Sequence, residues 1–347
     1  MSRTLLSLTL PASLLCTAAF ADVPDVAADI APVHSLVARV MDGVGTPSLI
    51  VQSGASPHEY SLRPSEARAL QEADLVFWIG PDLTPWLDDA IGTLATNAAV
   101  TELLEADGTI ELELREGALF EAHDHNSHAG EEHDDHDDHD DDHSDHDDHD
   151  DEHYDHDDHD DHEDEHEGHD DHAGHDHGEH DPHAWLSVQN AATWLNVIAG
   201  QLSAADPENA GAYFANASTG RAELQALTDE VNAMLEPVRD GQFIVFHDAY
   251  QYFEVDFDLT AAGAISISDA SDPSPARITE IRGRVADQGI DCVLAEPQFN
   301  PGLVATILDG TEAQTGILDP LGSDLEPGAN LYPQMIRNLA SALVGCM

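Results

Sequence analysis

Hydrophobic and polar positions follow two alternating periods along most of the chain. Short apolar runs of strand length are separated by segments whose apolar residues recur every three or four positions, as in an amphipathic helix. The expected strands are DVAADI, PSLIVQ, DLVFWIG, QFIVF, LTAAGAIS, IDCVLA and TGILDP. The expected helices are PVHSLVARVM, RPSEARALQEA, LTPWLDDAIGTL, DAYQYFEV, SPARITEIRGRVADQG, PGLVATILDG and a last helix from Pro333 to Leu343. This alternation predicts an α/β fold with parallel sheets.

A long helical pattern divides the alternation into two halves. Asp206 and Pro207, which suit a helix cap and a first helical turn, open a stretch of about 30 residues without a strong stop. A helix of that length, roughly 45 Å, can bridge two domains. We therefore expect an α/β lobe over residues 22–204, a linking helix over 205–238 and a second α/β lobe over 239–347. The cleft between the lobes is the expected ligand site, because ligands bind beyond the carboxyl ends of parallel strands.

Residues 121–181 interrupt the first lobe with a tract of histidine and acid. Histidines recur mostly every third residue, and the tract holds 31 of the 70 acidic residues and no arginine. It has too few apolar residues to offset the entropy of ordering, which predicts a disordered surface loop. Lengthening a connection to about 70 residues costs only about 2 kcal/mol of closure entropy, so the fold can carry it.

The rest of the chain is acidic as well. The formal net charge is −59, about −28 of it outside the tract, and all 11 basic residues are arginine. Such a negatively charged surface repels the phosphate backbone of nucleic acid, so we expect no nucleic-acid partner.

The first 25 residues, MSRTLLSLTLPASLLCTAAFADVPD, have the pattern of an export signal. Arg3 precedes an apolar run of about 16 residues, and the triplet ending at Ala21 suits signal-peptidase cleavage, which assigns residues 1–21 to the signal. Lipid attachment at Cys16 is the alternative, but Leu15 stands where a small residue is required. No later stretch is apolar for the roughly 18 to 20 residues that a membrane span needs. We expect a soluble, monomeric mature protein.

Two cysteines, Cys292 and Cys346, remain after removal of the signal. Export favours oxidation, so we expect them to pair and to tie the last helix to a strand of the second lobe. A two-thiolate metal site is the alternative, although the spacing has no C-x-x-C element.

Four histidines lie outside the tract: His34, His58, His183 and His247. His58 lies in a loop soon after a strand, His183 precedes a helix behind Asp-Pro, and His247 ends a strongly apolar strand. Asp319 ends another strand, so three imidazoles and a carboxylate from four segments could converge in the cleft. Taken singly, each histidine is more often a surface or hydrogen-bonded core residue, and Asp319 equally suits a turn cap. We assign His34 no role.

Several motifs in order resemble the ZnuA-type zinc-binding receptors of ABC importers, a branch of the cluster A-I metal-binding solute-binding proteins. The motifs are PHEYSLRPSEARALQEADLVFWIG, DPHAWLS directly after the tract, FHDAYQYF, EPQF and LDPLG. The resemblance implies that His58, His183 and His247 bind zinc, and it matches the two cysteines to the disulfide of the zinc members. It also implies a periplasmic, non-enzymatic receptor that captures Zn²⁺ and delivers it to a membrane permease driven by an ATPase.

The ligand types favour zinc over manganese. Imidazole suits Zn²⁺, whereas Mn²⁺ prefers more carboxylate, and manganese-binding relatives have a carboxylate where His247 stands. Three neutral imidazoles leave the double charge uncompensated, so a carboxylate or a hydroxide-like water is expected near the ion. Asp319 is the preferred fourth ligand and Glu59 the alternative. Glu296 and Arg277 are expected to be structural.

The tract is interpreted as an accessory to this site. It offers many weak chelates, none held in one geometry, and its last histidines approach His183: His169, His172, His175, His177 and His180. We expect it to gather zinc for the cleft or to sense zinc abundance; the alternative is a solvated spacer. Unchanged uptake after deletion of residues 123–180 would favour the spacer.

Three other functions fit parts of the pattern. A manganese receptor of the same family is the nearest, and a stand-alone periplasmic zinc buffer needs no transporter. A zinc hydrolase also uses three histidines with one open position, but the sequence has no H-E-x-x-H pair.

Overall fold

A computed structural model of the chain describes residues 23–115, 120, 180–266, 273–299 and 301–347. The chain divides into one compact unit, Met1–Phe120 with Gly178–Met347, and a second unit, Glu121–His177. All the described helices and strands belong to the first unit. The expected signal sequence, residues 1–21, and the tract as far as residue 179 lie outside the described residues.

The first sheet is parallel throughout, with the strand order β2-β1-β3-β4. Its strands are β1 Val26–Ala28, β2 Ser48–Leu49, β3 Leu75–Trp78 and β4 Ala99–Glu102, and its helices are α1 Ala31–Val40, α2 Pro64–Glu72 and α3 Pro85–Leu94. β1 and β3 are buried along their whole length, which explains their unbroken apolar runs. β4 was not predicted from the sequence, because this edge strand is partly exposed and has no continuous apolar run.

The second sheet repeats this topology with the order β6-β5-β7-β8, again all parallel. Its strands are β5 Phe243–His247, β6 Gly263–Ser266, β7 Cys292–Ala295 and β8 Gln314–Ile317, and its helices are α6 Gln251–Phe257, α7 Pro275–Gln288, α8 Pro301–Leu308 and α9 Leu331–Cys346. Two parallel sheets confirm the predicted α/β class.

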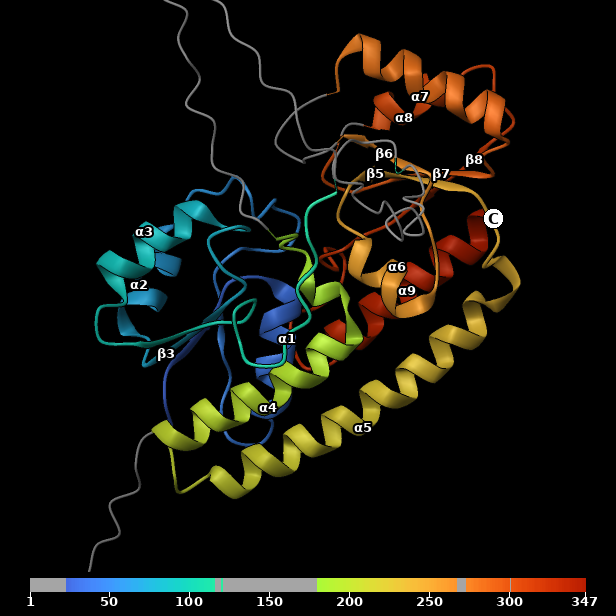
Figure 1. Ribbon diagram of the computed structural model, residues 1–347. Coiled ribbons are helices and arrows are strands. Elements are labelled where there is room, and N and C mark those ends of the chain that lie inside the picture. Colours follow the sequence, from blue (N-terminus) through green and yellow to red (C-terminus); the bar gives the residue numbers. More distant parts are fainter. Residues whose placement is uncertain (1–22, 116–119, 121–179, 267–272, 300) are drawn as a thin grey trace, which may run out of the picture. The chain divides into compact units, whose positions relative to one another are not determined.

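Two long helices connect the sheets in sequence. A short 3-10 turn, η1 Ala184–Leu186, leads into α4 Val188–Ala205, and α5 Ala210–Leu235 is followed by the turn η2 Glu236–Val238. α5 has 26 residues, about 39 Å, and Figure 1 shows it running beside α4 and α9. No described helix is both long and apolar enough to cross a membrane.

The predicted start of the long helix was wrong by a few residues. Asp206 ends α4 and does not cap α5. Its carboxylate accepts hydrogen bonds from the Asn209 side chain at 2.7 Å and from the Tyr213 hydroxyl at 2.8 Å. The Asp-Pro pair therefore makes the turn between the helices, and α5 begins at Ala210.

One continuous hydrophobic core joins the two sheets. It includes Phe77 of the first sheet, Phe243 of the second, and Trp194 and Tyr213 from the helices between them. Smaller clusters lie on the other faces, one with α2 and α3 and one with α7 and α8. Side chains at the ends of strands in both sheets are thus supported by a shared core.

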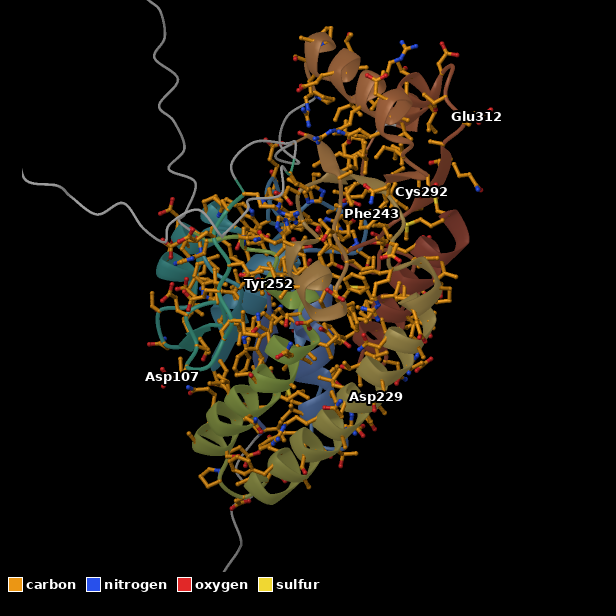
Figure 2. All side chains as sticks on the ribbon, turned by 45° about the vertical axis from the view of Figure 1, so that its right-hand side comes forward. Asp107, Asp229, Phe243, Tyr252, Cys292 and Glu312 are labelled. Atoms are coloured by element: carbon orange, nitrogen blue, oxygen red, sulfur yellow. A yellow bond between two sulfur atoms is a disulfide. The ribbon has the colours of Figure 1, made fainter. Side chains whose placement is uncertain are left out.

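The predicted disulfide is present. Cys292 in β7 and Cys346 at the end of α9 are bonded, with 5.7 Å between their Cα atoms. Figure 2 marks Cys292 close to Phe243, its partner in the register of the neighbouring strand. Closing a loop of 54 residues stabilises the fold by about 4 kcal/mol in the chain-entropy model.

Candidate metal centre

Three histidines from distant segments meet at one point. His58, His183 and His247 each offer a ring nitrogen, and these atoms all lie within 4.8 Å of one another. The ring centroid of His183 lies 5.5 Å from that of His58 and 5.2 Å from that of His247. Over the described part of the chain, no other group of three or more His, Cys, Asp or Glu side chains has this geometry.

The loop that carries His58 is held from two sides. Indole Nε1 of Trp86, on α3, donates to the carbonyl of Pro57 at 2.7 Å. Glu66, a buried residue of α2, accepts from the Tyr60 hydroxyl at 2.9 Å and from the backbone N–H of Arg63 at 2.7 Å. The motif PHEYSLRPSE therefore folds back on its own helix, and His58 is fixed between two anchored points.

Asp181 orients His183. Its Oδ1 accepts from the backbone N–H of His183 at 3.0 Å and lies 2.7 Å from Nδ1 of the same histidine. Both side chains are buried. Because Nδ1 faces the carboxylate, Nε2 is the ring nitrogen on the side away from it.

Glu296 orients His247 as Asp181 orients His183. This carboxylate follows β7, the strand beside β5, and its Oε1 lies 2.6 Å from Nδ1 and 3.3 Å from the backbone nitrogen of His247. Gln298 donates to the other oxygen at 3.1 Å, and the ring of Phe299 packs edge-on against the imidazole with a centroid distance of 5.6 Å. Two of the three imidazoles are thus fixed by a buried carboxylate.

Burial shifts the pKa values of ionisable groups at the site. Burial raises the pKa of Asp181 to about 7, against the opposing effects of the hydrogen bond from His183 and of the positive charge of Arg115. Burial, together with Glu296 and Asp319, raises the pKa of the Tyr250 phenol well above its usual value. A divalent cation at the histidines would favour the ionised carboxylates, because opposite charges attract strongly in a buried site.

The residues present fit a zinc ion. Imidazole nitrogen is a common zinc ligand, and a carboxylate on the second ring nitrogen is the usual support for a metal-binding histidine. With a cation bound, the ionised carboxylates of Asp181 and Glu296 would bring two negative charges beside the imidazoles, equal to the charge of one divalent ion. Charge balance therefore does not require a carboxylate in direct contact with the metal.

The structure does not bring Asp319 into the histidine cluster. One oxygen accepts from the backbone N–H groups of Leu321 and Gly322 at 3.1 and 3.0 Å, and the other from that of Ser323 at 2.6 Å. Gly322 has a φ of +68°, a conformation that glycine adopts without strain. These contacts fit the turn-capping alternative, and the role of Asp319 as preferred fourth ligand stays a prediction.

The other expected residues also stand apart from the cluster. Glu59, the alternative fourth ligand, is exposed. His34 is buried, with Nε2 3.1 Å from the carbonyl of Pro47. Of the accessory histidines, His180 is described and lies 3.5 Å from Glu111; His169, His172, His175 and His177 lie outside the described residues.

The roles of two carboxylates do not follow from the sequence motifs alone. Asp181 lies within the DPHAWLS motif, and Glu296, expected to be structural, pairs with His247. The signals were an aspartate two positions before a histidine and a glutamate after a strand that neighbours the strand ending in His247. Adjacent parallel strands place their carboxyl ends at the same edge, so the second pairing follows once the strand order is known.

Fold and site together define an α/β protein of two parallel four-stranded sheets with a candidate three-histidine metal centre. The family described as "ZnuA: Zinc-uptake complex component A periplasmic" matches residues 26–346. The chain belongs to this family, as its motifs predicted.

Curated and solved relatives agree with that assignment. A protein of Brucella abortus (strain 2308), named "High-affinity zinc uptake system protein ZnuA", is 49% identical over 322 residues, covering 93% of this chain and 91% of its own. A protein of the same name from Paracoccus denitrificans is 44% identical over 346 residues, covering 97% and 98%. A solved structure titled "Crystal structure of ZnuA" matches the fold with a TM-score of 0.67 at 22% identity, covering 94% of this chain and 99% of that one.

Proposed function

We propose that this protein is the zinc-binding receptor of an ABC importer and that His58, His183 and His247 are its metal ligands. The observation that carries the proposal is the meeting of these three side chains within 4.8 Å. Two further observations support the proposal. Buried carboxylates orient two of the three histidines, and relatives 44 to 49% identical to this chain are named as zinc-uptake proteins. Neutral imidazoles favour zinc over manganese, which prefers oxygen ligands.

Receptor function requires a compartment and partners. The family is described as periplasmic, which fits export and cleavage near Ala21. The protein would act there as a monomer, with lobes at residues 22–204 and 239–347 and a linking segment at 205–238, and would deliver Zn²⁺ to a permease driven by an ATPase. Docking on the permease releases the ion only if it favours a state of lower zinc affinity, since partners alter affinity through differential contacts.

The tract at residues 121–181 is proposed as an accessory zinc collector or sensor. Its composition offers many histidine and carboxylate ligands but few apolar residues to order them, so we expect it to bind divalent ions weakly and to exchange them fast. Its final histidine, His180, is three residues from His183, so ions gathered there lie close to the proposed ligands.

Zinc-limited growth tests the proposal. In a host deprived of its own receptor, a plasmid copy of this protein should restore growth under zinc chelation, and His247→Ala should not. His34→Ala is the matched control, since it removes another buried histidine that lies outside the cluster, and it should behave like the parent protein. Rescue by manganese at equal zinc would indicate a manganese receptor, and full rescue by His247→Ala would contradict the proposed ligands.

A further inference from the structure

The two chain segments that flank residues 121–179 lie side by side. Glu113 and His180 form an antiparallel bridge. The backbone N–H of Asp181 donates to the carbonyl of Leu112 at 2.7 Å. The second segment runs directly into His183, so whatever holds this pair also holds a proposed zinc ligand.

The side chain of Tyr252 holds both segments at once. This residue lies on α6, where Figure 2 labels it, and it is only 1% exposed. Its hydroxyl accepts from the backbone N–H of Leu112 at 2.9 Å and donates to the carbonyl of Asp181 at 2.9 Å. A single buried oxygen thus bridges the outgoing and the returning segment.

Neighbouring residues of α6 reinforce the bridge. With its amide nitrogen toward the two acceptors, Gln251 lies 3.2 Å from the carbonyl of Glu113 and 3.2 Å from Oδ2 of Asp181. Arg115 is paired with Glu254 on the same helix at 2.7 Å and with Asp248 at 3.0 Å. All these partners on the second half of the chain lie within seven residues of His247.

We infer that Tyr252 is a positioning residue for the metal centre, an inference that rests on the proposed function. Its hydroxyl fixes the backbone of Asp181, and Asp181 in turn fixes Nδ1 of His183. Tyr252 also belongs to the segment that follows His247, so the hydroxyl bridge sets the separation between these two imidazoles. Movement of the Asp181 backbone, and with it of His183, away from His247 would break this hydrogen bond, which makes the bridge a determinant of the zinc release rate.

The inference predicts a kinetic effect for Tyr252→Phe. The change removes one oxygen and leaves the part-buried N–H of Leu112 and the buried carbonyl of Asp181 without this partner, which loosens the contact between the segments. Residues that orient metal ligands typically change metal affinity 10- to 100-fold, so we expect zinc release about tenfold faster or more. The measurement uses the full chain, treated with nitrilotriacetate to remove weakly held ions, with transfer of the remaining zinc to a chromogenic chelator followed in time.

Tyr213→Phe is the matched control. Tyr213 is equally buried, and its hydroxyl donates to Asp206 in the turn between α4 and α5. This variant should lose comparable thermal stability in the metal-free form and release zinc at the parent rate. Gln251→Met, which removes the second bridge but keeps the tyrosine, should accelerate release in the same direction and serves if Tyr252→Phe does not fold.

The outcomes separate the two proposals. A parent chain that retains no tightly held zinc contradicts the proposed function itself. A parent that retains one equivalent, with release from both the Tyr252 and Gln251 variants at the parent rate, overturns the positioning role alone. Equal acceleration by Tyr213→Phe also overturns it, because the effect would then be general destabilisation.

Discussion

Replacing His58, His183 and His247 together by alanine should abolish tight zinc binding. The test is made in a chain whose residues 123–177 are exchanged for a short Gly/Ser linker, so that weak chelates in the tract do not mask the loss. Zinc bound to protein ligands owes its affinity to the number of donors that reach it in fixed geometry. Removing all three should lower the affinity by roughly a thousandfold or more, measured by competition with a chelating dye.

The control for this experiment is the linker-bearing chain with its histidines intact. It should bind one zinc ion tightly and retain the circular dichroism spectrum and melting temperature of the full-length protein. If the triple variant kept the zinc affinity of this control, the three histidines would not be the site.

Removing the charge of the supporting carboxylates should give the second largest effect. Asp181→Asn and Glu296→Gln keep the size of each side chain but take away the negative charge beside Nδ1 of His183 and of His247. Each should weaken zinc binding by about 10- to 100-fold, the usual cost of losing a carboxylate that supports a metal-binding histidine. Isothermal titration with a competing chelator measures the change.

Two other carboxylates provide matched controls. Asp319→Asn and Glu59→Gln remove one negative charge each. The Asp319 carboxylate accepts hydrogen bonds from the backbone of the turn that follows it, and Glu59 is exposed. Both variants should bind zinc as the parent does. A large loss of zinc affinity in Asp319→Asn, with the affinity of Glu296→Gln unchanged, would indicate that Asp319 is the fourth ligand. It would also contradict the account of charge balance.

The sequence was a good guide to the fold where burial dictated composition. β3 and β5 are buried on both faces and therefore appear as unbroken apolar runs. β4 was missed because an edge strand needs few apolar residues, and its pairing with β3 comes from backbone hydrogen bonds that no side-chain pattern records. The start of α5 was misplaced because Asp206 suits both a helix cap and a turn, and only its contact with Tyr213 decides between them.

The site was predictable in its ligand types but not in its supporting contacts. His58, His183 and His247 stood out because few histidines lie outside the tract and because two of them follow strands. The pairing of Glu296 with His247 depends on which strands are neighbours, and a single sequence does not give strand order. For Asp319 the sequence suits a ligand and a turn cap equally, and the hydrogen bonds to residues two to four positions ahead that favour the cap leave no sign in the sequence beyond Asp-Pro.

Zinc X-ray absorption on the linker-bearing chain loaded with one equivalent of zinc tests the central claim most directly. The account predicts a first shell of nitrogen and oxygen at about 2.0 to 2.1 Å, with the outer-shell scattering of three imidazoles and no sulfur. A spectrum with one imidazole or none, or with a sulfur shell, would contradict it.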